Sequence, residues 1–170
     1  MKRPLGVLWV TGLPGSGKST LAKAIQQSMQ DIGQMPLLLD GDSLRDALNL
    51  RQPQSYQIEN REQIAMSYAR LCQLFANQGF LVICATVSMF HAVRTWNRKN
   101  LPGYCEVFLD TETSILNSRD QKGLYTNSEA ASILPEFPTN PDVILRMHEP
   151  QDLMNGVHQC MDRWTQVLRS

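Results

Sequence analysis

The hydrophobic positions of this chain fall into short apolar runs that alternate with segments of helical periodicity. Five runs are apolar on both faces and short enough to be strands. The expected strands are 5–11, 35–40, 80–88, 104–110 and 141–146. Strands buried on both faces and separated by helices are typical of a parallel sheet that is covered by helices on both sides.

Between these runs, apolar residues recur at the three- and four-residue spacing of an amphipathic helix. A first helix ends near Gly33, which can cap it, and a longer helix, 57–78, ends at Gly79. Shorter helices are expected at 93–100 and 111–120. The stripes facing the core are Ile64, Tyr68, Leu71 and Phe75 in the long helix, and Leu153, Val157, Cys160, Trp164 and Leu168 in the last one.

Composition narrows the class of partner. The 170 residues are enough for one domain with a real core, so we expect 1–170 to form a single domain. The 16 basic and 16 acidic side chains balance, which argues against a nucleic-acid polymer or an anionic membrane as partner. No apolar run approaches the ~20 residues of a membrane helix. The basic start runs directly into the first apolar run, so we interpret it as the beginning of a strand rather than a signal peptide.

The chain has four cysteines, Cys72, Cys84, Cys105 and Cys160. They form no C-x-x-C pair and have no histidine at zinc spacing, and two lie in expected buried strands. We predict reduced structural thiols and a cytoplasmic protein.

A glycine-rich segment follows the first strand. Gly12–Ser19, GLPGSGKS, fits G-x-x-x-x-G-K-[ST] at every position and leads into a helix. Glycines let backbone N–H groups wrap a phosphate closely, and the helix start adds its positive dipole end. Lys18 can reach the β- and γ-phosphates, and the Ser19 hydroxyl suits Mg²⁺. The predicted triphosphate site comprises Gly12, Leu13, Pro14, Gly15, Ser16, Gly17, Lys18, Ser19 and Thr20.

The motif predicts an α/β fold of the P-loop NTP hydrolase type, with three layers and a five-stranded parallel sheet. A GTPase would carry N/T-K-x-D after a later strand, and none is present. The strand ending at Asp110 resembles a Walker B strand, but we favour Asp110 or Thr111 as the cap of the next helix. The proline-containing stretch of weak periodicity at about 121–141 is predicted to be a lid.

Two carboxylates end the second strand in LLLDGDSLRDAL. In such folds the carboxyl ends of the strands face the ligand, so Asp40 and Asp42 would lie beside the P-loop. One of them can accept the proton of an attacking hydroxyl or help to hold Mg²⁺. Arg45, one turn further on, can bind an anion. The alternative is a helix start capped by Asp42 or Ser43 with a solvated arginine.

The fragments GLPGSGKST, LDGDSLRDAL, ENREQIA, EVFLD and RDQKGLY occur in this order between about Val7 and Ile144. Together they resemble the adenylylsulfate kinase family, whose members show D-G-D-N-x-R and R-D-x-K-G-L-Y at similar spacing. The resemblance implies transfer of the γ-phosphoryl group of ATP to the ribose 3′-hydroxyl of a sulfated nucleotide. It therefore implies ATP and Mg²⁺ as cofactors and a small-molecule nucleotide acceptor as partner.

Carried over position by position, the resemblance gives roles to individual side chains. Asp42 would be the catalytic base or a Mg²⁺ partner of Ser19, with Asp40 in support. Arg45 and Arg61 would bind anionic groups of the acceptor, and Tyr56 falls near the aromatic that stacks on its base.

The same resemblance places three residues near the lid. Arg119, Lys122 and Tyr125 would belong to the lid and the ATP side, with Lys122 and Tyr125 also within reach of the acceptor. The role of Arg119 makes physical sense, since a guanidinium can lie flat against adenine.

The departures from the family pattern fall on the acceptor side. The family's Asn-Ile-Arg-Arg is here Gln63–Met66 with a one-residue gap, so the arginine pair is gone. The family's F-I-S-P-Y is here Thr86–Phe90, in which Ser88 and Phe90 remain candidate acceptor residues. The segment 126–145 has no Lys, Arg or His. Since lost polar partners weaken recognition strongly, these changes predict a different acceptor.

The stretch Ser88–Pro102 resembles polysaccharide-associated relatives that phosphorylate cytidine diphosphoramidate, so such an acceptor is favoured. A genuine adenylylsulfate kinase, a silent ATP-binding module and a kinase for a non-nucleotide acceptor stay open, as does a homodimer. Phe90 can instead pack at a helix start. Arg98 and Lys99 are expected on a solvated face, and His148 and His158 on the surface.

Overall fold

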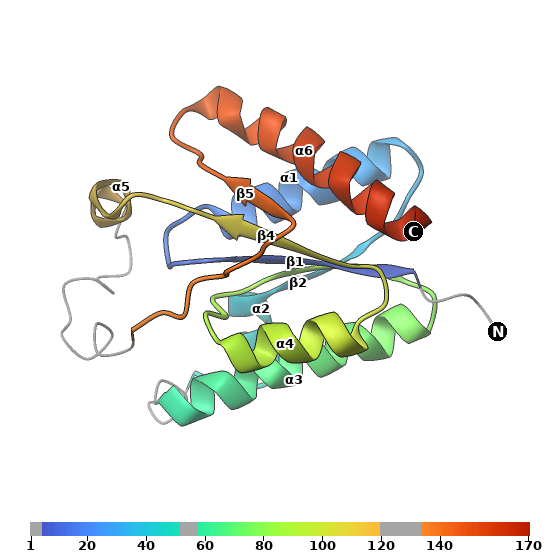
Figure 1. The fold of residues 1–170 in the computed structure, drawn as a ribbon, viewed down its shortest axis with the longest axis horizontal. Helices are drawn as coiled ribbons and strands as arrows, with labels where there is room; N and C mark the ends of the chain where they lie inside the picture. The colour runs from blue at the N-terminus through green and yellow to red at the C-terminus, as the bar shows by residue number, and fades with distance from the viewer. Residues whose placement is uncertain (1–4, 52–57, 120–133) are drawn as a thin grey trace.

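The computed structural model describes residues 5–51, 58–119 and 134–170 of the chain. Helices separate successive strands, as the apolar pattern predicts, and two helices stand between β2 and β3 (Figure 1). In chain order the elements are β1 Gly6–Gly12, α1 Lys18–Asp31, β2 Leu37–Asp40, α2 Gly41–Ala47, α3 Ile58–Asn77, β3 Leu81–Ala85, α4 His91–Asn100, β4 Tyr104–Leu109, α5 Thr113–Ser118, β5 Val143–Leu145 and α6 Pro150–Arg169.

The five strands form one parallel sheet in the order β2-β3-β1-β4-β5. All seven residues of the central strand β1 are buried, which explains its unbroken apolar sequence. This arrangement confirms the prediction of a five-stranded parallel P-loop fold.

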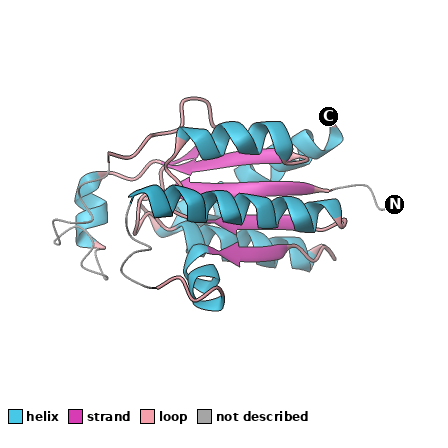
Figure 2. Cartoon of the chain, turned by 90° about the horizontal axis from the view of Figure 1, so that it is seen from below, coloured by secondary structure: helices cyan, strands magenta, loops and turns pink. Residues whose placement is uncertain are grey.

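Helices cover both faces of this sheet (Figures 1 and 2). Helices α1 and α6 pack on one face around Leu8, Val10 and Trp164, and α3 and α4 pack on the other around Trp9 and Tyr68. The expected stripe of α6 is confirmed, with Leu153 and Leu168 at its partly buried margin. Alternate residues of β1 thus serve opposite cores, as the two-residue period of a strand requires.

The stripe of α3 differs in part from the prediction. Ile64 and Tyr68 are buried, but Leu71 and Phe75 are only partly buried. Small side chains instead approach the sheet on the same face, and these are Ala65, Ala69, Cys72 and Ala76. A spacing argument weights large apolar residues, whereas close packing of a helix on a sheet favours small ones.

Two element ends were predicted wrongly. β3 stops at Ala85 rather than Ser88, because the Ser88 N–H donates to the carbonyl of Thr86, 3.1 Å away, in a tight turn that leaves the sheet. The cap of α5 is neither Asp110 nor Thr111: Glu112 occupies the N-cap position, without a side-chain cap hydrogen bond. Asp110 pairs with Arg146 instead, at 2.9 Å.

All four cysteines are free and buried, as predicted, and burial raises the pKa of Cys160 to about 12. A thiol with so high a pKa stays protonated and unreactive near neutral pH. None of the helices within the described ranges has both the length and the apolar character needed to cross a membrane. Most of the predicted lid, residues 121–133, lies outside the described residues, and 134–141 follow an irregular path.

Candidate active site

The predicted phosphate cradle follows β1 and opens at the carboxyl end of the sheet. Gly17 immediately precedes α1 with φ +96°, a left-handed conformation that favours glycine. No side chain caps α1 at this position. Because the first N–H groups of a helix have no partner within it, an uncapped start at a glycine turn suits an anionic ligand.

Lys18 lies across this loop. Its Nζ donates to the carbonyl of Leu13 at 2.7 Å and contacts the Ser16 hydroxyl at 3.5 Å. The side chain is therefore held over the glycine turn, where its ammonium group can meet phosphate oxygens. Backbone donors, the uncapped helix and this cation fit a triphosphate.

Asp40 connects the second strand to the loop. Its Oδ2 accepts a hydrogen bond from the Ser19 hydroxyl, and its Oδ1 accepts from the backbone N–H groups of Asp42 and Ser43 at 3.1 and 3.4 Å. Asp40, and not Asp42 or Ser43, is thus the N-cap of α2. A hydroxyl and a carboxylate side by side are the hard oxygen ligands that suit Mg²⁺. No group of three or more His, Cys, Asp or Glu residues that could hold a metal occurs within the described ranges, so such an ion would need further oxygens from water or phosphate.

Gly41 lets this turn approach the end of β3. A Cβ at this position would lie 3.2 Å from the Thr86 hydroxyl and 3.3 Å from the carbonyl of Ala85. The close approach places the D-G-D turn against the strand end that leads to Ser88. The following residue, Asp42, is exposed in the first turn of α2, and Arg45 is partly buried in its last turn.

The helices α2 and α3 share one region of the site. Burial raises the pKa of Tyr68 on α3, while the Arg45 cation opposes that rise and the Asp42 carboxylate adds to it. Asp42 and Arg45 are therefore both within electrostatic reach of Tyr68. Arg61 is partly buried near the start of the same α3. Asp40 and Asp42 thus lie at the start of α2, Arg45 lies one turn along it, and Arg61 lies near the start of α3. Tyr56, Lys122 and Tyr125 lie outside the described residues.

Arg119 stands on the other side of the P-loop. A Cβ built on Gly15 would lie 3.9 Å from Cβ of Arg119, and the Arg119 guanidinium is 3.5 Å from the carbonyl of Met147. Met147 also approaches Gly17, where an added Cβ would be 3.0 Å from its methyl group. Sequence reasoning missed Met147. Its position directly after β5, at the carboxyl edge of the sheet, is the signal that could have found it.

The loop after β3 carries Ser88 and Phe90. Ser88 is fully buried, its carbonyl accepts from the Thr11 hydroxyl at 3.1 Å, and its own Oγ has no hydrogen-bond partner. Phe90 is buried in the cluster between α3 and α4, which favours the packing alternative over stacking on a base. Both side chains are therefore buried beside the candidate acceptor side.

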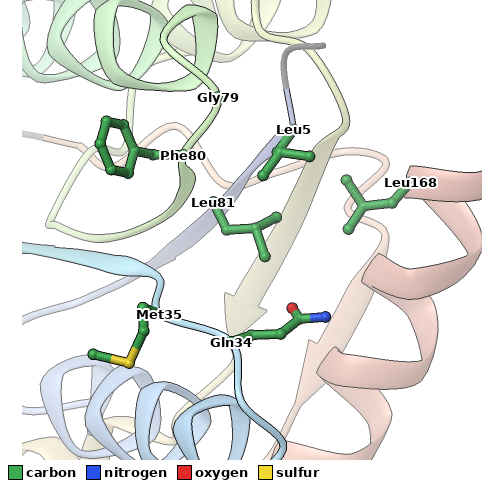
Figure 3. A pocket seen from close by; sticks show the side chains of 7 residues that line it. All are labelled: Leu5, Gln34, Met35, Gly79, Phe80, Leu81 and Leu168. Carbon is green, nitrogen blue, oxygen red and sulfur yellow. The ribbon is translucent and has the colours of Figure 1, made fainter. Parts of the chain in front are cut away.

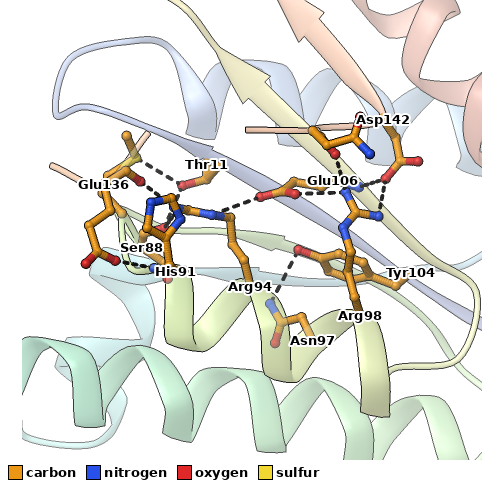
Figure 4. A network of polar contacts seen from close by, with 12 residues as sticks. Thr11, Ser88, His91, Arg94, Asn97, Arg98, Tyr104, Glu106, Glu136 and Asp142 are labelled. Carbon is orange, nitrogen blue, oxygen red and sulfur yellow. Dashed lines mark hydrogen bonds and ion pairs between the residues drawn. The ribbon is translucent and has the colours of Figure 1, made fainter. Parts of the chain in front are cut away.

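A polar network behind this loop was not predicted (Figure 4). Arg94 is buried, and Arg98 pairs with Glu106 at 3.0 Å and with Asp142 at 3.2 Å. Arg98 and Lys99 are both exposed, as expected of a solvated face, but the ion pairs of Arg98 were not predicted. Burial raises the pKa of Glu106, and the neighbouring Arg98 and Arg94 oppose that rise. His148 and His158 are exposed, as predicted.

A cavity of about 360 Å³ lies at the opposite end of the strands (Figure 3). Its lining is mainly apolar and includes Leu5, Met35 and Phe80, which precede β1, β2 and β3. It carries no charged side chain among its lining residues. The candidate nucleotide site is therefore the polar carboxyl edge and not this cavity.

Comparison with known proteins identifies the family of this chain. The family model for adenylylsulphate kinase matches residues 5–145. A cytidine diphosphoramidate kinase of Campylobacter jejuni is 36% identical over 128 residues, covering 75% of this chain and 74% of that protein. An adenylyl-sulfate kinase of Marinobacter nauticus is 34% identical over 168 residues, covering 92% of this chain and 80% of that protein.

Solved structures give the same result. The APS kinase of Mycobacterium tuberculosis, in complex with AMPPNP and APS, matches with a TM-score of 0.77 and 29% identity, covering 98% of this chain and 99% of that one. The family match covers most of the chain, including the P-loop and the aspartate turn beside it. This chain is a phosphotransferase and belongs to the adenylylsulphate kinase family.

Proposed function

We propose that this protein transfers the γ-phosphoryl group of ATP to the 3′-hydroxyl of a small nucleotide, with an acceptor of the cytidine diphosphoramidate type favoured over adenylylsulfate. The observation that carries this proposal is the hydrogen bond from Ser19 in the P-loop to Asp40 in the D-G-D turn. It joins the triphosphate cradle to the carboxylates of β2 and α2. The bound AMPPNP of the Mycobacterium relative supports ATP as the donor.

In this proposal the residues of the P-loop hold the phosphates of ATP. Lys18 stabilises charge on the β- and γ-phosphates, and Ser19 with Asp40 would hold Mg²⁺. When bound, Mg²⁺ neutralises phosphate oxygens and orients them for in-line transfer. Because Asp40 already contacts Ser19, we give Asp40 the metal-side role and keep Asp42 as the base.

Asp42 accepts the proton of the acceptor's 3′-hydroxyl as that oxygen bonds to the γ-phosphorus. The bond from the γ-phosphorus to the bridging oxygen breaks, and ADP leaves with that oxygen. A single aimed carboxylate is sufficient, since phosphoryl transfer depends mainly on positioning and charge neutralisation. Arg45 and Arg61, on α2 and α3, hold the anionic groups of the acceptor.

Two observations favour the amidate acceptor. The family's arginine pair is replaced by residues that include Ala65, which is buried against the sheet, and Met66. The described part of the segment before β5 contributes a carboxylate, Glu136, beside the loop that carries Ser88. A carboxylate beside the site can accept a hydrogen bond from the NH2 group of the amidate, whereas a sulfate group has no donor to offer it. The names of the Marinobacter and Mycobacterium relatives support adenylylsulfate as the second candidate.

The test supplies ATP and Mg²⁺ with cytidine diphosphoramidate in one reaction and adenylylsulfate in another, followed by mass spectrometry of the nucleotides. We expect a product heavier by one phosphoryl group in the first reaction, with a higher kcat/KM than in the second. Asp42→Asn should lower kcat by about 10²–10⁴ while AMPPNP still binds. Tight ATP binding without transfer to either nucleotide would overturn the proposal in favour of a silent module.

A further inference from the structure

The guanidinium of Arg94 is a deeply buried charge behind the loop after β3. Its side chain is 6% exposed, and a buried cation is stable only with close partners. One partner is the carboxylate of Glu106 on β4, with Arg94 Nε 3.7 Å from Oε1. Burial lowers the pKa of Arg94, and the carboxylate of Glu106 opposes that change. Glu106 balances the charge but uses only one edge of the guanidinium.

The other contacts of Arg94 go to two segments that are distant in sequence (Figure 4). Nη1 is 3.5 Å from the carbonyl of Ser88, and Nη2 is 2.7 Å from Nδ1 of His91 at the start of α4. Nη2 also donates to the carbonyl of Glu136. Because the guanidinium has no acceptor, His91 must accept through Nδ1 and carry its proton on Nε2. Arg94 thus joins the loop after β3 to the segment before β5.

Glu136 reinforces this connection from its own side. Its N–H donates to the carbonyl of Met89 at 3.0 Å, and its carboxylate accepts the N–H of His91. The Thr11 hydroxyl, at the end of β1, holds the carbonyl of Ser88. These bonds and those of Arg94 close a ring around the loop, so that moving one segment disturbs the others.

Arg98, one turn further along α4, fixes the next part of the same segment. It donates to the carbonyl of Asn140 at 2.7 Å and pairs with Asp142, which in turn pairs with Arg163 on α6. Residues 136–142 are therefore held along α4 at two points spaced one helical turn apart. The end held by Arg94 borders the acceptor side, whereas the end held by Arg98 and Arg163 borders β4 and α6.

From this arrangement we propose that Arg94 is a positioning residue for the acceptor, which sets the loop 88–90 against the segment at Glu136. The inference rests on the proposed function, since it takes the loop after β3 as a wall of the acceptor site. The contacts of Arg94 described here reach none of the residues 12–20 of the triphosphate cradle, whose own neighbours include Arg119, the C-cap of α5, and Met147, two residues beyond β5. Loss of the Arg94 contacts therefore acts on the acceptor and spares ATP.

The experiment compares Arg94→Lys, Glu136→Gln and the control Arg163→Gln in the full chain. Lysine keeps the charge but cannot reproduce the forked contacts. We expect Arg94→Lys to raise the KM of the acceptor by about tenfold, since small displacements of a binding wall cost that much or more. The KM of ATP and the Kd of AMPPNP should stay within about twofold. Glu136→Gln, an exposed and conservative change, should raise the acceptor KM less, and Arg163→Gln should change neither.

An equal rise in both KM values, or no rise in either, would overturn the inference. Hydrogen exchange at the amides of His91 and Glu136 gives a readout independent of the acceptor, and we expect faster exchange in Arg94→Lys than in Arg163→Gln. If the wild-type protein phosphorylates neither nucleotide, the proposed function is wrong and so is the acceptor role. In that case, faster exchange in Arg94→Lys would still show that Arg94 connects the two segments, and unchanged exchange would show that it does not.

Discussion

The Ser19 hydroxyl donates its hydrogen bond to Oδ2 of Asp40, and the other oxygen of that carboxylate caps α2. One side chain therefore connects the start of α1 to the start of α2. Whatever changes the position of Ser19 also acts on the helix that carries Asp42 and Arg45. The carboxylate of Asp40 thus couples the P-loop to the start of α2.

This coupling predicts that Ser19 and Asp40 act as a unit. Ser19→Ala and Asp40→Asn should each lower kcat by about 10²-fold, because each removes one oxygen ligand suited to the metal. The fold-loss of kcat in the double variant should be much smaller than the product of the two single fold-losses, because the effects of neighbours in one network are not additive. Steady-state kinetics over a range of Mg²⁺ concentrations measures this. Independent, multiplicative losses would contradict the shared role.

Gly17 and Gly33 offer a matched pair, since both have positive φ, +96° and +80°. A Cβ on Gly33 would meet nothing within 4 Å, whereas one on Gly17 would lie 3.0 Å from the Met147 methyl. Both alanine variants should lose about 1–3 kcal/mol of unfolding free energy. Only Gly17→Ala should also abolish AMPPNP binding, measured by calorimetry. Normal binding by Gly17→Ala would mean that this turn does not hold phosphate.

Arg119 is expected to act on ATP alone. Its backbone approaches Gly15, and its guanidinium can stack on adenine at a gain of about 1–2 kcal/mol. Arg119→Ala should raise the KM of ATP about tenfold and leave that of the acceptor unchanged. Arg146→Ala is the control, because this exposed arginine pairs with Asp110 at the next strand end. If Arg119→Ala raised the KM of the acceptor more than that of ATP, Arg119 would belong to the acceptor site and not to the ATP site.

The elements predictable from the sequence are those in which local pattern and tertiary packing agree. Buried parallel strands are apolar throughout, so β1 and β4 were found nearly to the residue. The P-loop was also predictable, because phosphate binding requires glycines and a lysine at fixed spacing. The cap of α2 was not, since three neighbouring polar residues compete for it and the bond to Ser19 decides for Asp40.

The network around Arg94 and Glu106 could not be predicted for a different reason. A charged residue on a polar helix usually faces solvent, and only the fold shows that α4 lies beside a glutamate of β4 and the segment before β5. The partners of Arg94 are up to 42 residues away in sequence, and two of them, the carbonyls of Ser88 and Glu136, belong to the backbone and leave no mark in side-chain patterns. Composition alone gives such an arginine no distinguishing feature.

The last prediction concerns pH and the start of α6. Asp152 accepts hydrogen bonds from the N–H groups of Glu149 and His148, at 2.8 and 2.9 Å, and these bonds lower the pKa of its carboxyl group. A carboxyl whose pKa is lower in the folded state stabilises the fold above its ordinary value of 3.8. That contribution is lost as the pH falls through the folded-state pKa.

Asp152→Ala should therefore lower the Tm by about 2 °C at pH 7, and the difference from the wild type should shrink as the pH falls below the ordinary value. Asp162→Ala is the matched control, because Asp162 is an exposed aspartate further along the same helix. It lies away from the helix start, so its removal should leave the Tm difference small at both pH values. Thermal unfolding followed by circular dichroism between pH 7 and pH 3 measures both variants. A Tm difference for Asp152→Ala that is constant across this range would show that its ionised form contributes nothing to the cap.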